Sequence, residues 1–126
     1  MKKKRIIREE IIPLIIQGGY MINVLLVCSA GMSTSLLVEK VKTEAKGRNI
    51  DIQISAIGEA EARSHPLNID VMLLGPQVRY LEKSIRAMIE SKGRNIAMGT
   101  VEMVAYSTMN GSKVLDQIIV LNEEKK

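Results

Sequence analysis

Apolar residues follow two different patterns along the chain from residue 21 onward. Short stretches that are continuously apolar, or that alternate apolar and polar residues, are typical of β-strands, whereas apolar residues spaced three or four positions apart are typical of helices. On this basis we predict strands at residues 22–27, 50–57, 69–74 and 96–98, and helices at residues 36–45, 60–65, 78–89 and 114–121. Residues 99–109 are expected to form a loop.

The order of these segments predicts the fold class. A strand followed by a helix, repeated four times, is the pattern of an α/β protein in which a parallel sheet has helices on both faces. Right-handed crossovers leave few arrangements, and we expect an open four-stranded sheet in the flavodoxin-like order 2-1-3-4. Ligands of such sheets bind outside the carboxyl ends of the strands, beside the first strand. Position alone therefore points to residues 28–35 as the candidate site.

Composition and charge describe one nearly neutral domain. The chain has 126 residues, which suffices for a single domain with a substantial core, and we assign residues 21–126 to it. There is no Trp or Phe and only three Tyr, so stacking on nucleic-acid bases is not expected. The net charge is +4, but residues 1–20 contribute +3 of it through five basic and two acidic side chains. Without clustered basic residues in the domain, we expect no nucleic-acid partner.

Residues 1–20 form a basic, isoleucine-rich N-terminal extension. Its longest apolar stretch, residues 11–16, is short, contains Pro13 and is not followed by a cleavage pattern of small residues, so no export signal is predicted. We expect a poorly ordered extension, or a start codon assigned upstream of Met21. A short amphipathic helix on a partner or membrane surface is the alternative. No other apolar run reaches membrane length, which favours a cytoplasmic protein.

The candidate chemistry lies between the first predicted strand and the first predicted helix. The sequence there is Cys28-Ser29-Ala30-Gly31-Met32-Ser33-Thr34-Ser35, a stretch of mostly small and hydroxylated residues. Backbone N–H groups in such a turn can converge on an anion, and the positive end of the following helix adds to them. The same environment stabilises a thiolate. We therefore predict that Cys28 is a nucleophile and that residues 29–35 form a phosphate-binding loop.

Cys28 has a simpler interpretation that must be weighed against this one. It is the single cysteine, which excludes an intramolecular disulfide and a multi-cysteine metal site. A lone cysteine at a strand end is often a small buried residue, and hydroxylated residues after it are often helix N-caps. The order of strand, cysteine, small hydroxylated loop and helix favours a reactive cysteine. The single histidine, His65, is expected to be a solvated loop residue and not a phosphoryl acceptor.

This arrangement resembles the low-molecular-weight tyrosine phosphatases, whose loop reads Cys-x5-Arg-Ser. In the present chain Thr34 stands at the arginine position and is followed by Ser35. A guanidinium there would clamp the phosphoryl oxygens and stabilise the charge that develops during hydrolysis. The chain also has no Asp-Pro pair to supply a general acid. We therefore expect that a phosphocysteine at Cys28 persists long enough to be passed on.

Three segments resemble one bacterial family more closely. The stretch CSAGMSTSLLV, residues 28–38, is similar to the active-site segment of the enzyme IIB components of the lactose/cellobiose family of the phosphoenolpyruvate-dependent sugar phosphotransferase system. VMLLGPQVRYL, residues 71–81, resembles the second motif of that family, and residues 106–115 resemble a weaker third one. Together the resemblance covers residues 21–122.

The resemblance implies a mechanism and partners. A phosphohistidine on an enzyme IIA partner would phosphorylate Cys28, and a sugar would take the phosphoryl group during import through a membrane enzyme IIC. The protein would be a sugar phosphotransferase for a β-glucoside or a disaccharide such as cellobiose, lactose or chitobiose, and it would need no metal or organic cofactor. It would be cytoplasmic and would meet the inner face of the membrane through enzyme IIC. Gly75-Pro76-Gln77 is most simply a tight turn with Pro at the first helical position. A second interpretation is that Gln77 and Tyr80 border the crevice at the strand ends and contact a docking partner, as is also expected of Tyr106.

Some features depart from this family and keep other functions open. Gly99-Thr100 and Tyr106-Ser107 replace the acidic residue and the Tyr-Gly pair that are common in the third motif, and Asn110 is expected to be the N-cap of the last helix. A degenerate tyrosine phosphatase and a regulatory domain that senses sugar flux are the alternatives. A thiol arsenate reductase is disfavoured because the chain has no resolving cysteine.

Overall fold

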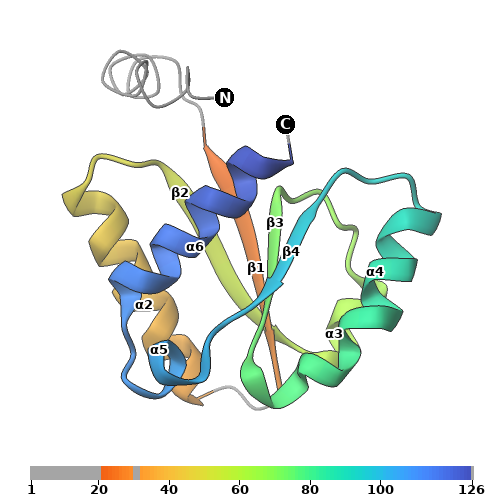
Figure 1. Ribbon diagram of the computed structural model, residues 1–126, viewed down its shortest axis with the longest axis horizontal. Coiled ribbons are helices and arrows are strands. Elements are labelled where there is room, and N and C mark those ends of the chain that lie inside the picture. Colours follow the sequence, from red (N-terminus) through yellow and green to blue (C-terminus); the bar gives the residue numbers. More distant parts are fainter. Residues whose placement is uncertain (1–20, 30–31, 126) are drawn as a thin grey trace.

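The computed structural model of the protein describes residues 21–29 and 32–125 (Figure 1). The predicted N-terminal extension, residues 1–20, lies outside the described residues, as do Ala30 and Gly31 of the predicted phosphate-binding loop. Within the described part of the chain, no helix has both the length and the apolar character needed to cross a membrane.

Four parallel strands form the central sheet. They are β1 (Ile22–Cys28), β2 (Ile52–Gly58), β3 (Val71–Leu74) and β4 (Ala97–Thr100), in the order β2-β1-β3-β4. The predicted fold class and strand order are therefore confirmed. The continuously apolar stretch of β1 is explained by its position between two other strands, because a central parallel strand is buried on both faces.

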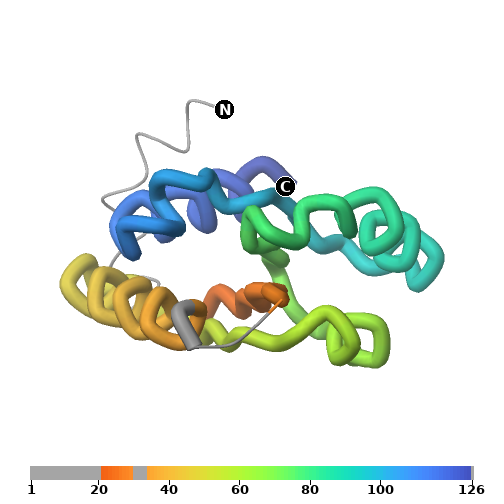
Figure 2. The backbone as a smooth tube through the Cα atoms, turned by 90° about the horizontal axis from the view of Figure 1, so that it is seen from below, coloured from red at the N-terminus to blue at the C-terminus, as the bar shows by residue number. Residues whose placement is uncertain are grey.

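Helices cover both faces of the sheet (Figure 2). One face is covered by α2 (Met32–Gly47), α5 (Met103–Ser107) and α6 (Gly111–Glu124), whose apolar residues pack with Ile22, Val24 and Leu26 of β1. The other face is covered by α3 (Glu59–Ser64), the 3-10 helix η1 (Pro76–Leu81) and α4 (Glu82–Ser91), which pack with Leu25 and Val27. Successive residues of β1 thus serve two separate cores, as the two-residue period of a strand requires.

Two sequence predictions about the elements need correction. The predicted loop 99–109 contains the end of β4 and the five-residue helix α5, whose Ala105 and Tyr106 are buried. Five residues are too few for apolar periodicity to be recognised in the sequence. The predicted helix 78–89 is divided, because Val78 has non-helical dihedral angles and the 3-10 helix η1 precedes α4. The remaining strand and helix predictions are correct to within a few residues at their ends.

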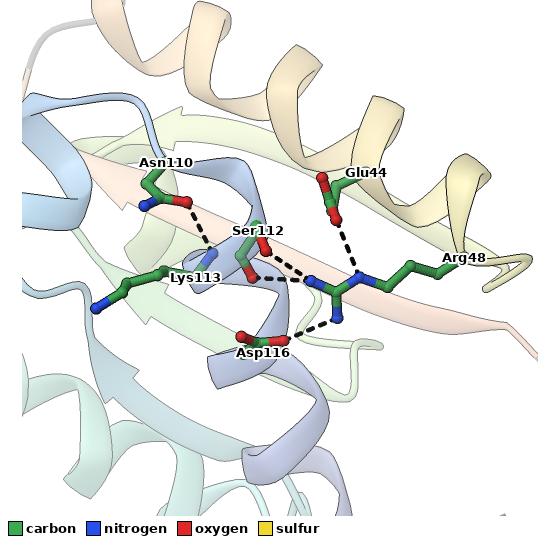
Figure 3. A network of polar contacts seen from close by, with 6 residues as sticks. All are labelled: Glu44, Arg48, Asn110, Ser112, Lys113 and Asp116. Carbon is green, nitrogen blue, oxygen red and sulfur yellow. Dashed lines mark hydrogen bonds and ion pairs between the residues drawn. The ribbon is translucent and has the colours of Figure 1, made fainter.

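The two long helices on the first face, α2 and α6, are joined by polar contacts on their outer surface (Figure 3). The guanidinium of Arg48, just after α2, donates to Glu44 at 3.1 Å, to Asp116 at 2.8 Å and to the Ser112 hydroxyl at 2.8 Å. At the start of α6 the side chain of Asn110 accepts from the backbone N–H of Lys113 at 3.1 Å, which confirms the predicted N-cap. Arg48 therefore connects the end of α2 to the first half of α6.

Candidate functional site

Cys28 is the last residue of the central strand β1, at the carboxyl edge of the sheet. This edge lies at the bottom of Figure 1, where the chain leaves β1 toward α2. The side chain is buried, with 2% of its surface exposed, and Sγ lies 3.7 Å from the carbonyl oxygen of Ile57 in the neighbouring strand. The thiol is therefore buried at the edge of the sheet where ligands of parallel α/β sheets bind.

Two glycines flank Cys28 on the neighbouring strands. Gly58 is its register partner at the end of β2, and Gly75 follows β3 and donates from its N–H to the carbonyl oxygen of Val27 at 2.8 Å. A Cβ on Gly75 would lie 3.7 Å from Cβ of Cys28 and 3.3 Å from Oε1 of Gln77. Gly75 has φ −64°, so a left-handed conformation does not explain the glycine. The turn after β3 thus passes close to Cys28, at a distance where a Cβ on Gly75 would make an ordinary van der Waals contact with it.

The predicted phosphate-binding loop is shorter than expected, because α2 begins at Met32. Residues 32–35 form the first turn of this helix. The first four N–H groups of a helix have no partner within it, and they carry the positive end of its dipole. No acidic side chain stands in this first turn. An anion beside the start of α2 would therefore meet the positive end of the helix and no acidic side chain of its first turn.

The hydroxyl groups of the predicted loop differ in position. Ser29 and Ser35 are exposed, whereas Thr34 is fully buried and its Oγ1 lies 3.1 Å from the hydroxyl oxygen of Tyr106. Tyr106 is itself only 7% exposed, so it lies beneath the first turn of α2 and offers little surface to a docking partner. Sequence reasoning missed this contact, since the two residues are 72 positions apart and no local pattern relates them.

The other two residues predicted for docking are at the surface of the same edge. Gln77 is exposed, and Tyr80 is 68% exposed and donates a hydrogen bond to Oε1 of Glu59 at 2.9 Å. This hydrogen bond raises the pKa of Tyr80 above its ordinary value of 10.0, because the neutral hydroxyl is the form that donates. Apolar side chains are also exposed near this edge, just after the first turn of α2 and at the start of α5: Leu36, Met103 and Val104.

Two depressions adjoin the carboxyl ends of the strands. One has a volume of about 600 Å³ and is lined by Ser29, Arg63 and residues 58–61. The other has a volume of about 420 Å³ and is lined by Pro76, Arg79 and residues 100–103.

Among the residues that the structure describes, no group of three or more His, Cys, Asp or Glu side chains is arranged to hold a metal ion. His65 is half-buried, and its Nδ1 accepts from the N–H of Leu67 at 3.0 Å.

The sequence matches one protein family over most of its length. The family model described as the lactose/cellobiose-specific IIB subunit of the phosphotransferase system matches residues 23–117. The oligo-beta-mannoside-specific EIIB component of Bacillus subtilis is 36% identical over 99 residues, which are 79% of this chain and 94% of that protein. The cellobiose-specific and galactose-specific EIIB components of Lactococcus lactis are each 38% identical over 95 residues, covering 71% of this chain and 86% of theirs.

Solved structures show the same fold. The cellobiose-specific phosphotransferase IIB component of Borrelia burgdorferi superposes with a TM-score of 0.68 at 38% identity, covering 85% of this chain and 96% of the other. The lactose-specific IIB component domain of Streptococcus pneumoniae superposes with a TM-score of 0.69 at 18% identity, covering 79% and 96% of the two chains. At that low identity the second match supports the fold alone.

Proposed function

The chain belongs to the lactose/cellobiose-specific IIB family of the phosphotransferase system, and we propose that Cys28 is the residue on which it carries a phosphoryl group. One observation supports this assignment above the others. Cys28 ends the central strand at the carboxyl edge of the sheet, and the N-terminus of the 16-residue helix α2 follows four residues later. A thiolate and a thiophosphate are both anions, and a helix N-terminus stabilises either one.

The proposed reaction has two steps. In the first, the Cys28 thiolate attacks the phosphorus of a phosphohistidine on enzyme IIA, so that an S–P bond forms and the N–P bond breaks. In the second, a sugar hydroxyl attacks the same phosphorus, the S–P bond breaks, and Cys28 leaves as a thiolate while the hydroxyl proton is lost to a base. No redox step is involved, and the reaction as written needs no metal or organic cofactor.

The absence of an arginine from residues 29–35 favours transfer to a sugar over hydrolysis. Thr34 occupies the position at which the tyrosine phosphatases carry arginine, and it is buried with its hydroxyl against Tyr106. Without a guanidinium, the equatorial oxygens of the phosphoryl group are held by backbone N–H groups and neutral hydroxyls. The phosphocysteine then persists until enzyme IIC presents a sugar hydroxyl as the acceptor.

The surface around Cys28 is the proposed docking face for both partners. It comprises Gln77 and Tyr80 on η1 together with exposed apolar side chains on α2 and α5, namely Leu36, Met103 and Val104. A mixed surface of one aromatic and several flexible apolar side chains suits successive docking of two different proteins. Enzyme IIA would dock in the cytoplasm, and enzyme IIC would bring the same face to the inner side of the membrane.

The relatives are named for different sugars, so they support the family and not one sugar. Similar identity is shared with proteins named for oligo-beta-mannosides, cellobiose and galactose. We place the present chain in a system for a β-glucoside or a disaccharide such as cellobiose, lactose or chitobiose. Within this system the membrane partner selects the sugar, because Cys28 needs to contact only the phosphoryl group.

The test is a measurement of intact protein mass. The chain is incubated with phosphoenolpyruvate, the general phosphotransferase proteins and a lactose/cellobiose-type enzyme IIA, and is compared with the Cys28→Ser and His65→Asn variants. We expect the unmodified chain and His65→Asn to gain one phosphoryl group, and Cys28→Ser to gain none. Phosphorylation of Cys28→Ser, or its loss in His65→Asn alone, would overturn the assignment. Failure of all three with several charged enzyme IIA donors would favour the regulatory or phosphatase functions.

A further inference from the structure

A buried pair of hydroxyl groups lies beneath the proposed site. Oγ1 of Thr34, in the first turn of α2, is 3.1 Å from the hydroxyl oxygen of Tyr106 in α5. Thr34 has no exposed surface and Tyr106 has 7%. In such a pair one hydroxyl donates and the other accepts, and burial from water makes the loss of either partner costly. The pair connects α5 to the first turn of α2, which follows Cys28 in the chain.

The α5 side of this contact is firmly anchored. The N–H of Val101 donates to the carbonyl oxygen of Leu74 at 2.9 Å, which fixes the exit of β4 against the exit of β3. The N–H of Tyr106 donates to the carbonyl oxygen of Glu102 at 2.9 Å, and the Tyr106 ring packs into the core that α2 and α6 share with the sheet. The hydroxyl of Tyr106 therefore projects toward α2 from a rigid support.

We propose that Tyr106 is a positioning residue for phosphoryl transfer, because its hydroxyl holds Thr34 and thereby fixes the first turn of α2 relative to Cys28. This proposal rests on the proposed function of Cys28. The backbone N–H groups of that turn must be aimed before the phosphoryl group arrives, because preorganised donors stabilise developing charge without reorganisation. A displacement on the order of 1 Å at a reacting centre can cost up to about a hundredfold in rate. Tyr106 thus acts from behind the site, and not through contact with a partner.

Conservative variants isolate the two hydroxyl groups. Tyr106→Phe keeps the buried ring and removes its hydroxyl, Thr34→Val keeps the shape and removes the other, and Thr34→Ser keeps a hydroxyl. Thr108→Val is the matched control, because Thr108 is exposed at the end of α5 and its Oγ1 donates to Val104 of the same helix at 2.7 Å. Urea unfolding of each variant identifies the conditions under which it is fully folded.

The measurement is the rate at which each variant accepts a phosphoryl group from charged enzyme IIA. We expect Tyr106→Phe and Thr34→Val each to lower the maximal rate by about tenfold, as loss of one buried hydrogen bond allows, with little change in the donor concentration for half-maximal rate. Thr34→Ser should recover most of the rate and Thr108→Val should retain it. The double variant Tyr106→Phe/Thr34→Val should be slower than the unmodified chain by about tenfold and no more, because both changes break the same contact.

Other outcomes separate the two proposals. If Tyr106→Phe is fully folded and as fast as the unmodified chain, the hydroxyl pair is structural only and the positioning role is wrong. If Tyr106→Phe weakens donor binding without lowering the maximal rate, Tyr106 acts in docking and the positioning role is again wrong. If the rate reductions of the two single variants multiply in the double variant, the two hydroxyl groups act independently, and the positioning role is also wrong. If the unmodified chain accepts no phosphoryl group, or if the Cys28→Ser variant accepts one, it is the proposed function that fails.

Discussion

Tyr80 illustrates how one exposed hydrogen bond links two elements at the edge of the site. It extends from η1 and donates to Glu59, the first residue of α3, at 2.9 Å. The donated hydrogen bond is the largest cause of the raised pKa of Tyr80, followed by partial loss of hydration and by repulsion between the phenolate and the Glu59 carboxylate. Glu59 also pairs with Arg63 at 3.6 Å, which acts in the opposite direction on the pKa.

Replacement of this carboxylate should change the titration of Tyr80. We expect Glu59→Ala to return the pKa of Tyr80 toward its ordinary value of 10.0, because both the acceptor and the repelling charge are removed. The measurement is an alkaline titration of tyrosinate ultraviolet absorbance, with Tyr80→Phe identifying the transition. The stabilisation from this contact is complete below the ordinary pKa and is lost as the pH rises through the raised one. An unchanged titration in Glu59→Ala would contradict the prediction.

At the scale of elements, the start of α6 makes an unusually close contact with α2. Gly111 is buried at the first position of α6, and a Cβ added there would lie 2.6 Å from the backbone carbon and oxygen of Lys40. The added Cβ would meet backbone atoms of Lys40, so the rotation of a flexible side chain cannot relieve the contact. The glycine is therefore required by the distance between the helices and not by its conformation.

The substitution Gly111→Ala should accordingly destabilise the protein. We expect the free energy of unfolding to fall by about 1–3 kcal/mol, because α6 must move away from α2 to accommodate the methyl group. Gly47→Ala is the matched control, since a Cβ at Gly47 meets nothing within 4 Å, and it should be neutral or add about 0.5–1 kcal/mol. Urea unfolding followed by circular dichroism measures both. If Gly111→Ala and Gly47→Ala have equal free energies of unfolding, α2 and α6 accommodate the added methyl group without loss of stability, and the prediction is wrong.

The elements also show what the sequence could and could not predict. Apolar periodicity located all four strands, and the order of segments was enough to predict the sheet, because a crossover between parallel strands has a preferred hand. The place of Cys28 at the end of β1 followed from the same pattern. The contact between Thr34 and Tyr106 did not, since it depends on a short helix with no detectable period and on how that helix packs against α2. Long-range side-chain pairing of this kind is a product of the assembled fold.

At the scale of the whole molecule, β1 belongs to two cores at once. Val24 is 2% exposed and packs into the core beneath α2 and α6, whereas Val27 is fully buried and packs into the core beneath α3 and α4. Alternate side chains of one strand therefore bind the two helical layers to the same backbone. Loss of either layer would expose half of the apolar surface of β1 and of β3, so the molecule should unfold as one cooperative unit.

This shared strand can be tested with one substitution in each core. We expect Val24→Ala and Val27→Ala each to lower the free energy of unfolding by about 2 kcal/mol, through lost apolar burial and incomplete closure of the cavity. Because the two side chains point to opposite faces and share no packing partners, the double variant should lose the sum within about 0.5 kcal/mol. Urea unfolding, followed in parallel by far-ultraviolet circular dichroism and tyrosine fluorescence, should give a single coincident transition for every variant with an unchanged slope. Two separated transitions in either single variant would show instead that one helical layer detaches while the other stays folded on the sheet.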